Sequence, residues 1–264
     1  YYKLVSDANT FLEKVENISF ANEDIKKQYM AEVHFLRALA YFDLVRYWEH
    51  IPIVTKTISQ AEALALPQSE AKEVYEQVII PDLEFACANL NNSPKNYLGK
   101  AVEGHATQIA AKALLGRVYL TMAGFPLNDG SKKDLARSLF KEVIDYADAN
   151  KKYWAKDSEE WKRIWISDND NKYHIFEIQY QNGGLGLGNR MIFEACPGLY
   201  SAYTIVRIFG NHIYCERQLS DEFQKTYNKK MDTRCLATID TTKFVNTDGA
   251  TPVKYTGGDF FIKF

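Results

Sequence analysis

The sequence predicts a mainly α-helical fold of tetratricopeptide-like helical hairpins (an α-α superhelix) with an irregular, loop-rich flank that contains a few short strands. Three observations support this fold class. Apolar residues recur with helical period through residues 1–150. Two pairs of these segments share one spacing of small and aromatic residues. Residues 151–264 instead hold glycine-rich and aromatic loops. We therefore expect helical hairpins over 1–150 and an irregular flank over 151–264, packed on the same domain.

The first two predicted helices differ in how much of their surface is apolar. Residues 1–16 carry apolar side chains at helical spacing on one face. The next helix spans about 23–48, with Asn22 or Ser19 as N-cap. Three of its polar side chains mark a narrow stripe, because they fall within about 60° of one another on a helical wheel: Glu32, Asp43 and Arg46. A helix that is apolar on all its other faces must be packed on both sides.

Arg37 lies on this second helix but away from the polar stripe. A buried guanidinium needs hydrogen-bonding partners to offset the loss of its hydration. We expect a structural role in which Arg37 holds carbonyl groups or a carboxylate, and we regard a ligand contact as the weaker alternative.

Three further helices follow a loop after Pro52. The segment "SEAKEVYEQVIIPDLEFACANL" predicts a helix with Ser69 as its N-cap, and Pro81 should kink or split it. Periodic apolar patterns also predict helices over about 104–123 and about 132–150.

The spacing of small and aromatic residues pairs these helices into two hairpins. One helix of each pair carries a small residue and then a tyrosine three positions later: Ala38 and Tyr41, and Gly116 and Tyr119. The other helix carries alanine, an aromatic residue and valine: Ala71, Tyr75 and Val78, and Ala136, Phe140 and Val143. Small residues let two helices approach closely, and the aromatic rings fill the space between them. This pattern is tetratricopeptide-like with lengthened turns, and stacks of this kind usually serve as binding scaffolds.

The flank is irregular and rich in aromatic residues. The segment "YHIFEIQYQN" at 173–182 alternates like a strand. Long irregular sections within a helical protein are usually functional or disordered, and the aromatic content favours order.

Charge and cysteine content exclude several classes of function. The formal net charge of -2 gives no electrostatic basis for binding nucleic acid or an anionic membrane surface. No cysteine pair has CxxC spacing, so dithiol redox and zinc motifs are absent. Cys87 is expected to be a buried thiol, while Cys196 and Cys215 could form a disulfide that the sequence does not decide.

No motif indicates a cofactor or a catalytic centre. The loop "NGGLGLGN" lacks the spacing of a dinucleotide motif, and neither HExxH nor GxSxG occurs. The segment "SDNDNK" begins like a calcium loop but lacks glycine at the sixth and glutamate at the twelfth position. We expect no cofactor, with a structural calcium near Asp168 and Asp170 as the alternative.

The candidate ligand-binding residues lie in the flank. Aromatic rings can stack on sugar rings or on peptide side chains, while amide, guanidinium and imidazole groups bind hydroxyls or carbonyls. The stacking candidates are Tyr180, Tyr200, Tyr203 and Tyr214, and the polar candidates are Asn182, Arg190 and His212. Any single ring among them could instead belong to a local core.

Several segments together resemble one known family. "AEVHFLRALAYFDLVRYWEHIPIV" at 31–54 resembles the signature helix and turn of the SusD/RagB family, surface glycan-binding lipoproteins of Bacteroidetes. "LPQSEAKEVYEQVIIPDLEFACANL", "GHATQIAAKALLGRVYL" and "YTGGDFFIKF" are similar to later family segments. Glu49 and His50 depart from the pattern, because the family usually has glycine and a small polar residue there. The family's N-terminal portion, with its lipidated cysteine, and its C-terminal portion are expected to lie outside this chain.

The resemblance implies a non-enzymatic protein that captures oligosaccharides and delivers them to a TonB-dependent transporter of the SusC type. It also implies a lipid-anchored, surface-exposed location at the outer membrane. Three alternatives remain open: a family member that binds peptide, a glycoside hydrolase and a generic tetratricopeptide scaffold. A hydrolase would need two carboxylates roughly 5 to 10 Å apart, for which Glu177 and Asp221 are the first candidates.

Overall fold

The computed structural model describes residues 1–96, 98–102, 104–157, 159–160 and 172–180, together with the backbone of 239–240 and 260–261. The chain divides into two compact units. The first, which we call the helical body, comprises Tyr1–Tyr153 and Ile175–Glu177. The second comprises Trp154–His174 and Ile178–Phe264. None of the described helices is long and apolar enough to cross a membrane.

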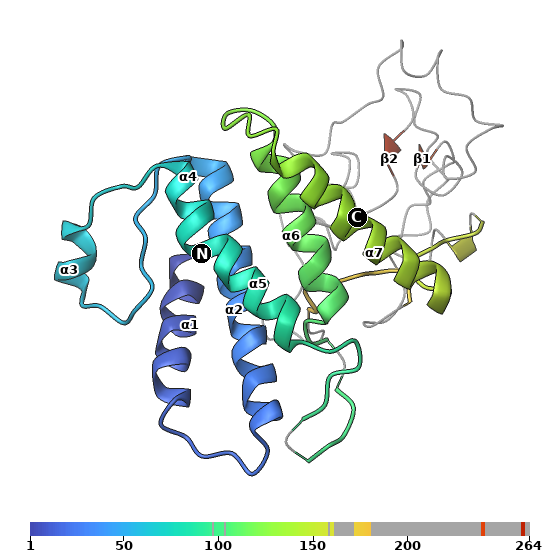
Figure 1. The fold of residues 1–264 in the computed structure, drawn as a ribbon, viewed down its shortest axis with the longest axis horizontal. Helices are drawn as coiled ribbons and strands as arrows, with labels where there is room; N and C mark the ends of the chain where they lie inside the picture. The colour runs from blue at the N-terminus through green and yellow to red at the C-terminus, as the bar shows by residue number, and fades with distance from the viewer. Residues whose placement is uncertain are drawn as a thin grey trace, which may run out of the picture. The chain divides into compact units, whose positions relative to one another are not determined.

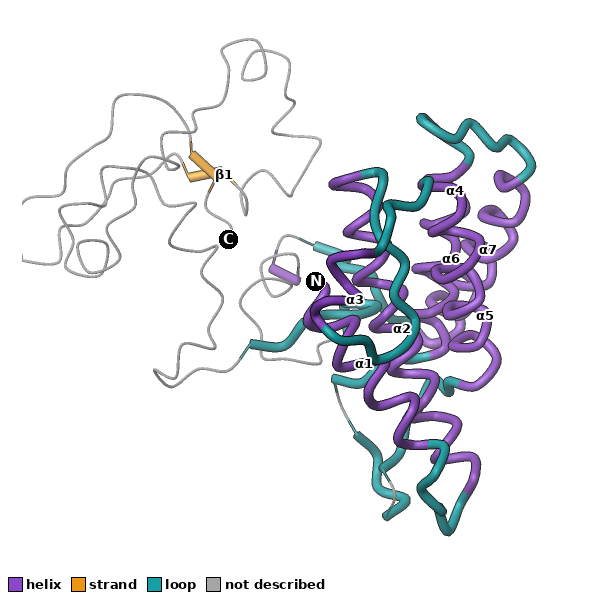
Figure 2. Tube along the Cα trace, turned by 90° about the vertical axis from the view of Figure 1, so that its left-hand side faces the viewer, coloured by secondary structure: helices purple, strands orange, loops and turns teal. Residues whose placement is uncertain are grey.

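The helical body is a series of helices in which neighbours in the chain pack on one another, which confirms the predicted fold class (Figure 1). Contacts join α1 to α2, α2 to α5, α5 to α6, and α6 to α7. Figure 2 shows α5, α6 and α7 side by side from a second direction. The elements are α1 (Tyr2–Val15), α2 (Glu23–Trp48), α3 (Gln60–Ala65), α4 (Ala71–Val74), the π-helical turn η1 (Tyr75–Ile79), α5 (Ile80–Asn89), α6 (Gln108–Met122) and α7 (Lys132–Asn150).

Local caps explain where the long helices begin. The side chain of Asn22 accepts a hydrogen bond of 2.8 Å from the backbone N–H of Asp24, which confirms Asn22 as the N-cap of α2. Thr107 caps α6 in the same way through the N–H of Ala110, at 3.2 Å. This cap places the start of α6 at Gln108, a few residues later than the sequence pattern suggested.

The predicted N-cap at Ser69 is wrong. Ser69 forms an isolated β-bridge with Ile51, in which each backbone N–H donates to the other residue's carbonyl at 2.9 and 3.2 Å. This extended backbone moves the start of α4 on by one residue. Glu70 becomes the N-cap, and its N–H donates to the carboxylate of Glu73 at 3.1 Å.

The helix that contains Pro81 is split, as the sequence predicted. Proline has no N–H to continue the α-helical hydrogen bonds. The preceding turn, η1, is π-helical, and the N–H of Ile80 donates to the carbonyl of Tyr75. α5 then continues with Pro81 in its first turn.

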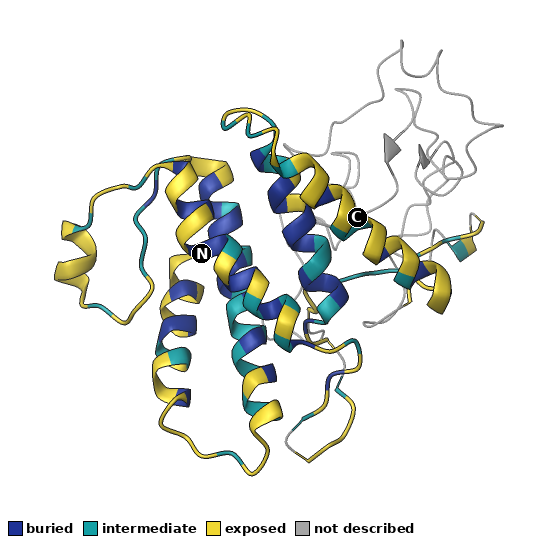
Figure 3. Cartoon of the chain, in the orientation of Figure 1, coloured by how far each residue is buried: buried dark blue, intermediate teal, exposed yellow. Residues whose placement is uncertain are grey.

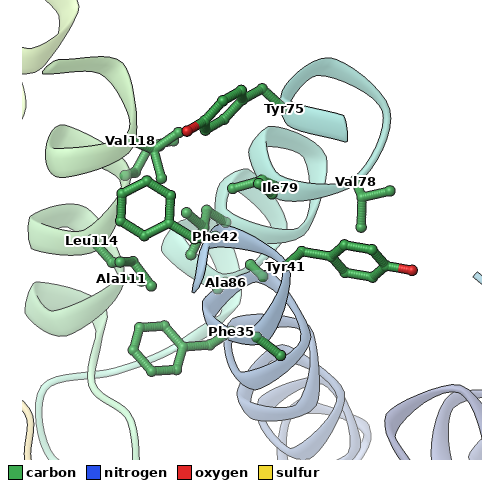
Figure 4. Close-up of a cluster of buried hydrophobic side chains, with 14 of the residues drawn as sticks. Phe35, Tyr41, Phe42, Tyr75, Val78, Ile79, Ala86, Ala111, Leu114 and Val118 are labelled. Atoms are coloured by element: carbon green, nitrogen blue, oxygen red, sulfur yellow. The ribbon is translucent and has the colours of Figure 1, made fainter. Parts of the chain in front are cut away.

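The core confirms that α2 is packed on more than one side. Phe35, Tyr41 and Phe42 are fully buried in a cluster with side chains from α5 and α6 (Figure 4). Figure 3 shows α6 as mostly buried and α3 as exposed. The C-terminal end of α2 departs from this pattern, because Tyr47 and Trp48 are exposed.

Gly116 shows why the hairpin spacing needs small residues. A Cβ atom placed on Gly116 would lie 2.8 Å from the Cε1 atom of Phe140. The ring of Phe140 therefore occupies the space that the missing side chain leaves between α6 and α7. Ala38 and Ala136, the small residues at related positions, are both buried.

The predicted strand at 173–182 is absent from the part of it that the structure describes, 173–180. Phe176 instead packs against Phe35, with ring centroids 4.9 Å apart and planes at 71°. The alternating pattern predicted an extended, half-buried segment but could not supply a partner strand.

The described strands are β1 (Ile239–Asp240) and β2 (Phe260–Phe261), which pair antiparallel with Ile239 opposite Phe261.

Candidate functional site

Of the seven candidate ligand-binding residues, Tyr180 lies within the described residues. Its side chain is 48% exposed, and Ile178 beside it is also exposed. The remaining six lie outside the described residues: Asn182, Arg190, Tyr200, Tyr203, His212 and Tyr214. Asp168, Asp170, Asp221, Cys196 and Cys215 lie outside them too. The assignment of these residues to a ligand site therefore stays a prediction.

Within the described residues, no group of three or more His, Cys, Asp or Glu side chains could hold a metal ion. Glu177, one of the two carboxylates considered for hydrolysis, is half-buried and belongs to the helical body.

Arg37 is buried and forms a two-pronged ion pair with Asp82 of α5. Its Nε donates to Oδ2 at 2.8 Å, and its Nη2 donates to Oδ1 at 2.7 Å. Nη1 donates to the side-chain oxygen of Asn9 on α1 at 2.8 Å. The expected carboxylate partner is confirmed, and the role of Arg37 is structural.

The partners of Arg37 extend this network to the chain after α2. Nδ1 of His34 lies 2.6 Å from the same Asp82 oxygen that Arg37 contacts. The amide of Asn9 donates to the carbonyls of Val54 and Lys56, at 2.9 and 3.2 Å. This network joins α1, α2, α5 and residues 52–56. Its charged groups are mutually satisfied, so it serves packing better than ligand binding.

Tyr41 fixes the same segment. Its hydroxyl donates to the carbonyl of Val54 at 3.0 Å and accepts from the Val54 N–H at 2.7 Å. Burial raises the pKa of Tyr41 to about 12. The hydroxyl thus remains protonated and is fully used by the protein.

One pocket lies between α1 and the segment that leads into α3. Its volume is about 250 Å³ and its lining is largely apolar. The Tyr2 hydroxyl at its edge donates to the carbonyl of Pro52 at 2.9 Å. The lining residues are Tyr2, Val5, Ser6, Pro52, Val54, Lys56, Ile58, Ser59, Gln60 and Ala63.

A second pocket, the hairpin-end pocket, lies where the end of α2 meets the start of the next helix and the α6–α7 turn. Its volume is about 310 Å³. Arg46 lies over the ring of Phe42 at 4.5 Å, and Tyr75 meets the same ring edge-on at 6.3 Å. The lining residues are Val45, Arg46, Glu49, Ala71, Tyr75, Thr121, Phe125, Pro126 and Leu127. The sequence reasoning did not identify this pocket, although it noted Glu49 as unusual.

Three aromatic side chains form an exposed patch at the end of α2. Tyr1, Tyr47 and Trp48 have ring centroids 5.5 to 6.3 Å apart. The side chains of Tyr47 and Trp48 are 64% and 58% exposed. The predicted packing of this helix on all faces outside its polar stripe is therefore wrong at Tyr47 and Trp48. The signal available was two consecutive large aromatics at the helix end.

Comparison with known proteins finds SusD-like relatives of the helical body. A SusD-like family model described as "Starch-binding associating with outer membrane" matches residues 1–120. A SusD-like protein of Bacteroides ovatus is 30% identical over 152 residues, which are 55% of this chain and 26% of that protein. The chain thus spans about a quarter of the length of that relative.

Solved structures agree in fold. A SusD superfamily protein from Parabacteroides distasonis aligns with a TM-score of 0.79 at 25% identity, over 100% of this chain and 54% of that one. A laminarin-binding SusD-like protein aligns with a TM-score of 0.67 at 23% identity, over 98% of this chain and 56% of that one. The chain therefore covers about half of each of these proteins.

Proposed function

We propose that the chain is a member of the SusD/RagB family that captures oligosaccharides at the outer-membrane surface and delivers them to a TonB-dependent transporter of the SusC type. The observation that carries the proposal is the family match over residues 1–120, which hold α1 to α5 and most of α6. The protein would be lipid-anchored and surface-exposed. It would bind its ligand without cleaving it.

The proposed glycan site lies in the flank. Tyr180, Tyr200, Tyr203 and Tyr214 would stack on sugar rings, and Asn182, Arg190 and His212 would hydrogen-bond sugar hydroxyls. The exposure of Tyr180 supports its part in this site. Stacking needs a flat ring whose face is open to the ligand.

The proposed transporter contact lies on the helical body. The aromatic patch of Tyr1, Tyr47 and Trp48 is a suitable surface, because exposed aromatic residues carry much of the binding energy at protein interfaces. A buried network of Arg37, Asp82 and Asn9 lies within the same body and would keep the helices that bear this surface rigid.

A binding screen tests the proposed function. A protein that includes the whole chain would be run in affinity gels against laminarin, starch and other plant, host and microbial polysaccharides. Laminarin belongs in the panel because one protein of the same fold is named for binding it, and starch because the family description names it. Each polysaccharide that retards the protein would then be assayed for release of reducing ends.

Retardation without release of reducing ends is the result we expect. Release of reducing ends would make the protein a glycoside hydrolase and would contradict the proposal. Binding of peptides in place of any polysaccharide would assign it to the peptide-binding alternative.

A further inference from the structure

We propose that the hairpin-end pocket binds a small, uncharged, polyhydroxylated ligand of one or two sugar rings. This site goes beyond the proposed function, because every lining residue belongs to the helical body and none is a candidate glycan residue of the flank. Five features of the pocket support the inference: a buried hydroxyl, a strained glutamate, the balance of charge, an exposed aromatic ring and the volume.

The buried hydroxyl belongs to Tyr75. This side chain is 4% exposed and lines the pocket, yet no residue in the described part of the chain forms a hydrogen bond with its oxygen. Figure 4 shows the hydroxyl end of Tyr75 directed toward α6, near Val118. A buried hydroxyl without a partner is unfavourable, so such groups almost always bond to protein, water or ligand.

Two other buried tyrosines make the contrast clear. The hydroxyl of Tyr41 bonds to Val54, and that of Tyr119 donates to the carboxylate of Glu84 at 3.3 Å. Tyr75 also begins the π-helical turn η1, and π-helical turns are frequent at functional sites. Tyr75 is therefore a pocket-lining residue whose hydroxyl forms no hydrogen bond within the part of the chain that the structure describes.

Glu49 occupies a backbone conformation that disfavours it. Its φ of 58° lies in the left-handed region, which glycine adopts without steric cost and in which a residue with a Cβ atom is strained. Strain of this kind is enriched at functional sites. Glu49 is one of the residues that line the pocket, and a carboxylate offers only hydrogen-bond acceptors.

The charges of the lining favour an uncharged ligand. Arg46 and Glu49 carry opposite charges, and Arg46 is also paired with Asp43. The Thr121 hydroxyl donates to the carbonyl of Arg117 at 2.8 Å, which leaves its lone pairs to accept. The pocket thus offers both donors and acceptors without an excess of either charge, as a set of ligand hydroxyls requires.

The rim and the volume favour a ring-shaped ligand. Phe125 lines the pocket with its side chain 87% exposed, so its face is open to the apolar C–H side of a sugar ring. The volume of about 310 Å³ lies at the lower end of the roughly 300–1,000 Å³ typical of small-molecule sites. One or two sugar rings match that size.

Two substitutions test the site without disturbing the fold. Tyr75→Phe removes the hydroxyl but keeps the ring, and Glu49→Gly removes the carboxylate while relieving the backbone strain. Tyr146→Phe removes a hydroxyl that does not line the pocket. Lys151→Gly, at a φ of 51°, relieves comparable strain away from it. These two variants are the matched controls, and thermal melting verifies that all four variants are folded.

Binding of the methyl glycosides of glucose, galactose, mannose and xylose would be measured by saturation-transfer NMR and calorimetry. We expect at least one to bind the wild type, with affinity about tenfold weaker in Tyr75→Phe and in Glu49→Gly, because each loses a hydrogen bond. Tyr146→Phe and Lys151→Gly should bind like the wild type.

Two results would overturn the inference: no methyl glycoside binds the folded wild type, or both pocket variants bind as tightly as the wild type. Tyr203→Ala separates this site from the flank. Methyl glycoside binding that survives Tyr203→Ala but is weakened by Tyr75→Phe belongs to the hairpin-end pocket, whatever the polysaccharide screen finds.

Discussion

At the scale of single residues, the sequence predicted the environment of Arg37 but not the identity of its partner. Its place on an otherwise apolar helix was enough to predict burial and a partner. The identity of that partner was not predictable, because Asp82 lies 45 positions away and the pairing depends on how α2 and α5 pack. Tyr75 and Glu49 were missed for the same reason, since only the folded chain brings them to one pocket.

Replacing Asp82 should destabilise the fold strongly. Asp82→Asn leaves the buried guanidinium of Arg37 without its anion, which should lower the free energy of unfolding by about 3–5 kcal/mol. Urea unfolding followed by circular dichroism measures this change. Asp7→Asn, which removes the exposed pair with Lys3, is the control and should cost about 0–1 kcal/mol. Equal losses in the two variants would show that the buried pair contributes no more to the free energy of unfolding than the exposed pair does.

Cys87 should react slowly with alkylating reagents. Burial raises the pKa of the Cys87 thiol to about 12, which disfavours the charged thiolate at neutral pH. At pH 8 iodoacetamide should modify Cys87 more than about 100-fold more slowly than in the urea-unfolded chain, as peptide mass spectrometry would measure. The rate should keep rising above pH 9, where an ordinary thiol levels off. A folded-state rate that levels off near pH 9 would contradict the raised pKa.

At the scale of elements, the sequence predicted what depends on neighbouring residues. Periodicity and caps placed α1, α2 and α7 to within about a residue at each end, because those signals lie within or beside the helix. The cap at Ser69 was wrong because its backbone pairs with Ile51, a contact outside the helix. α3 was missed although its capping box, Ser59 with Glu62, is readable in the sequence.

The contact between Gly116 and Phe140 gives an element-scale prediction. Gly116→Ala would gain about 1 kcal/mol in helix propensity but would press a Cβ atom to 2.8 Å from the Phe140 ring, an overpacking that costs roughly 1–3 kcal/mol. We expect a net loss of about 1 kcal/mol in urea unfolding. The second substitution Phe140→Leu should reduce that loss by making room.

Gly124→Ala is the matched control for this substitution. Its added Cβ atom would meet nothing closer than 3.6 Å, so the change in stability should stay within about 0.5 kcal/mol. A Gly116→Ala variant as stable as the Gly124→Ala variant would mean that α6 and α7 do not pack as closely as the hairpin spacing requires.

At the scale of the whole molecule, the predicted mainly α-helical fold is confirmed, and the SusD-like match over residues 1–120 supports the predicted family resemblance. The glycan site stays a prediction. A repeated spacing of small and aromatic residues predicts helical hairpins from the sequence alone. The sequence of the flank has no such period, so it carries no signal for which of its side chains come together. Composition could nominate aromatic and polar residues there but could not place them together.

The aromatic patch should bind the transporter independently of glycan. The double substitution Tyr47→Ala and Trp48→Ala should weaken recovery of a co-expressed SusC-type transporter in pull-downs, because it removes the exposed rings from the proposed interface. The same variant should be retarded in polysaccharide gels like the wild type. Unchanged recovery of the transporter would rule out the patch as the contact surface.

The central claim is that the flank captures glycan, and calorimetric titration of the wild type and three variants tests it most directly. With the polysaccharide that the screen identifies, Tyr203→Ala and Asn182→Ala should each bind at least about tenfold more weakly, since each removes a stacking or hydrogen-bonding group. The Tyr47→Ala variant, which changes an exposed tyrosine of the helical body, should bind the polysaccharide like the wild type. Wild-type affinity in both flank variants would contradict the claim.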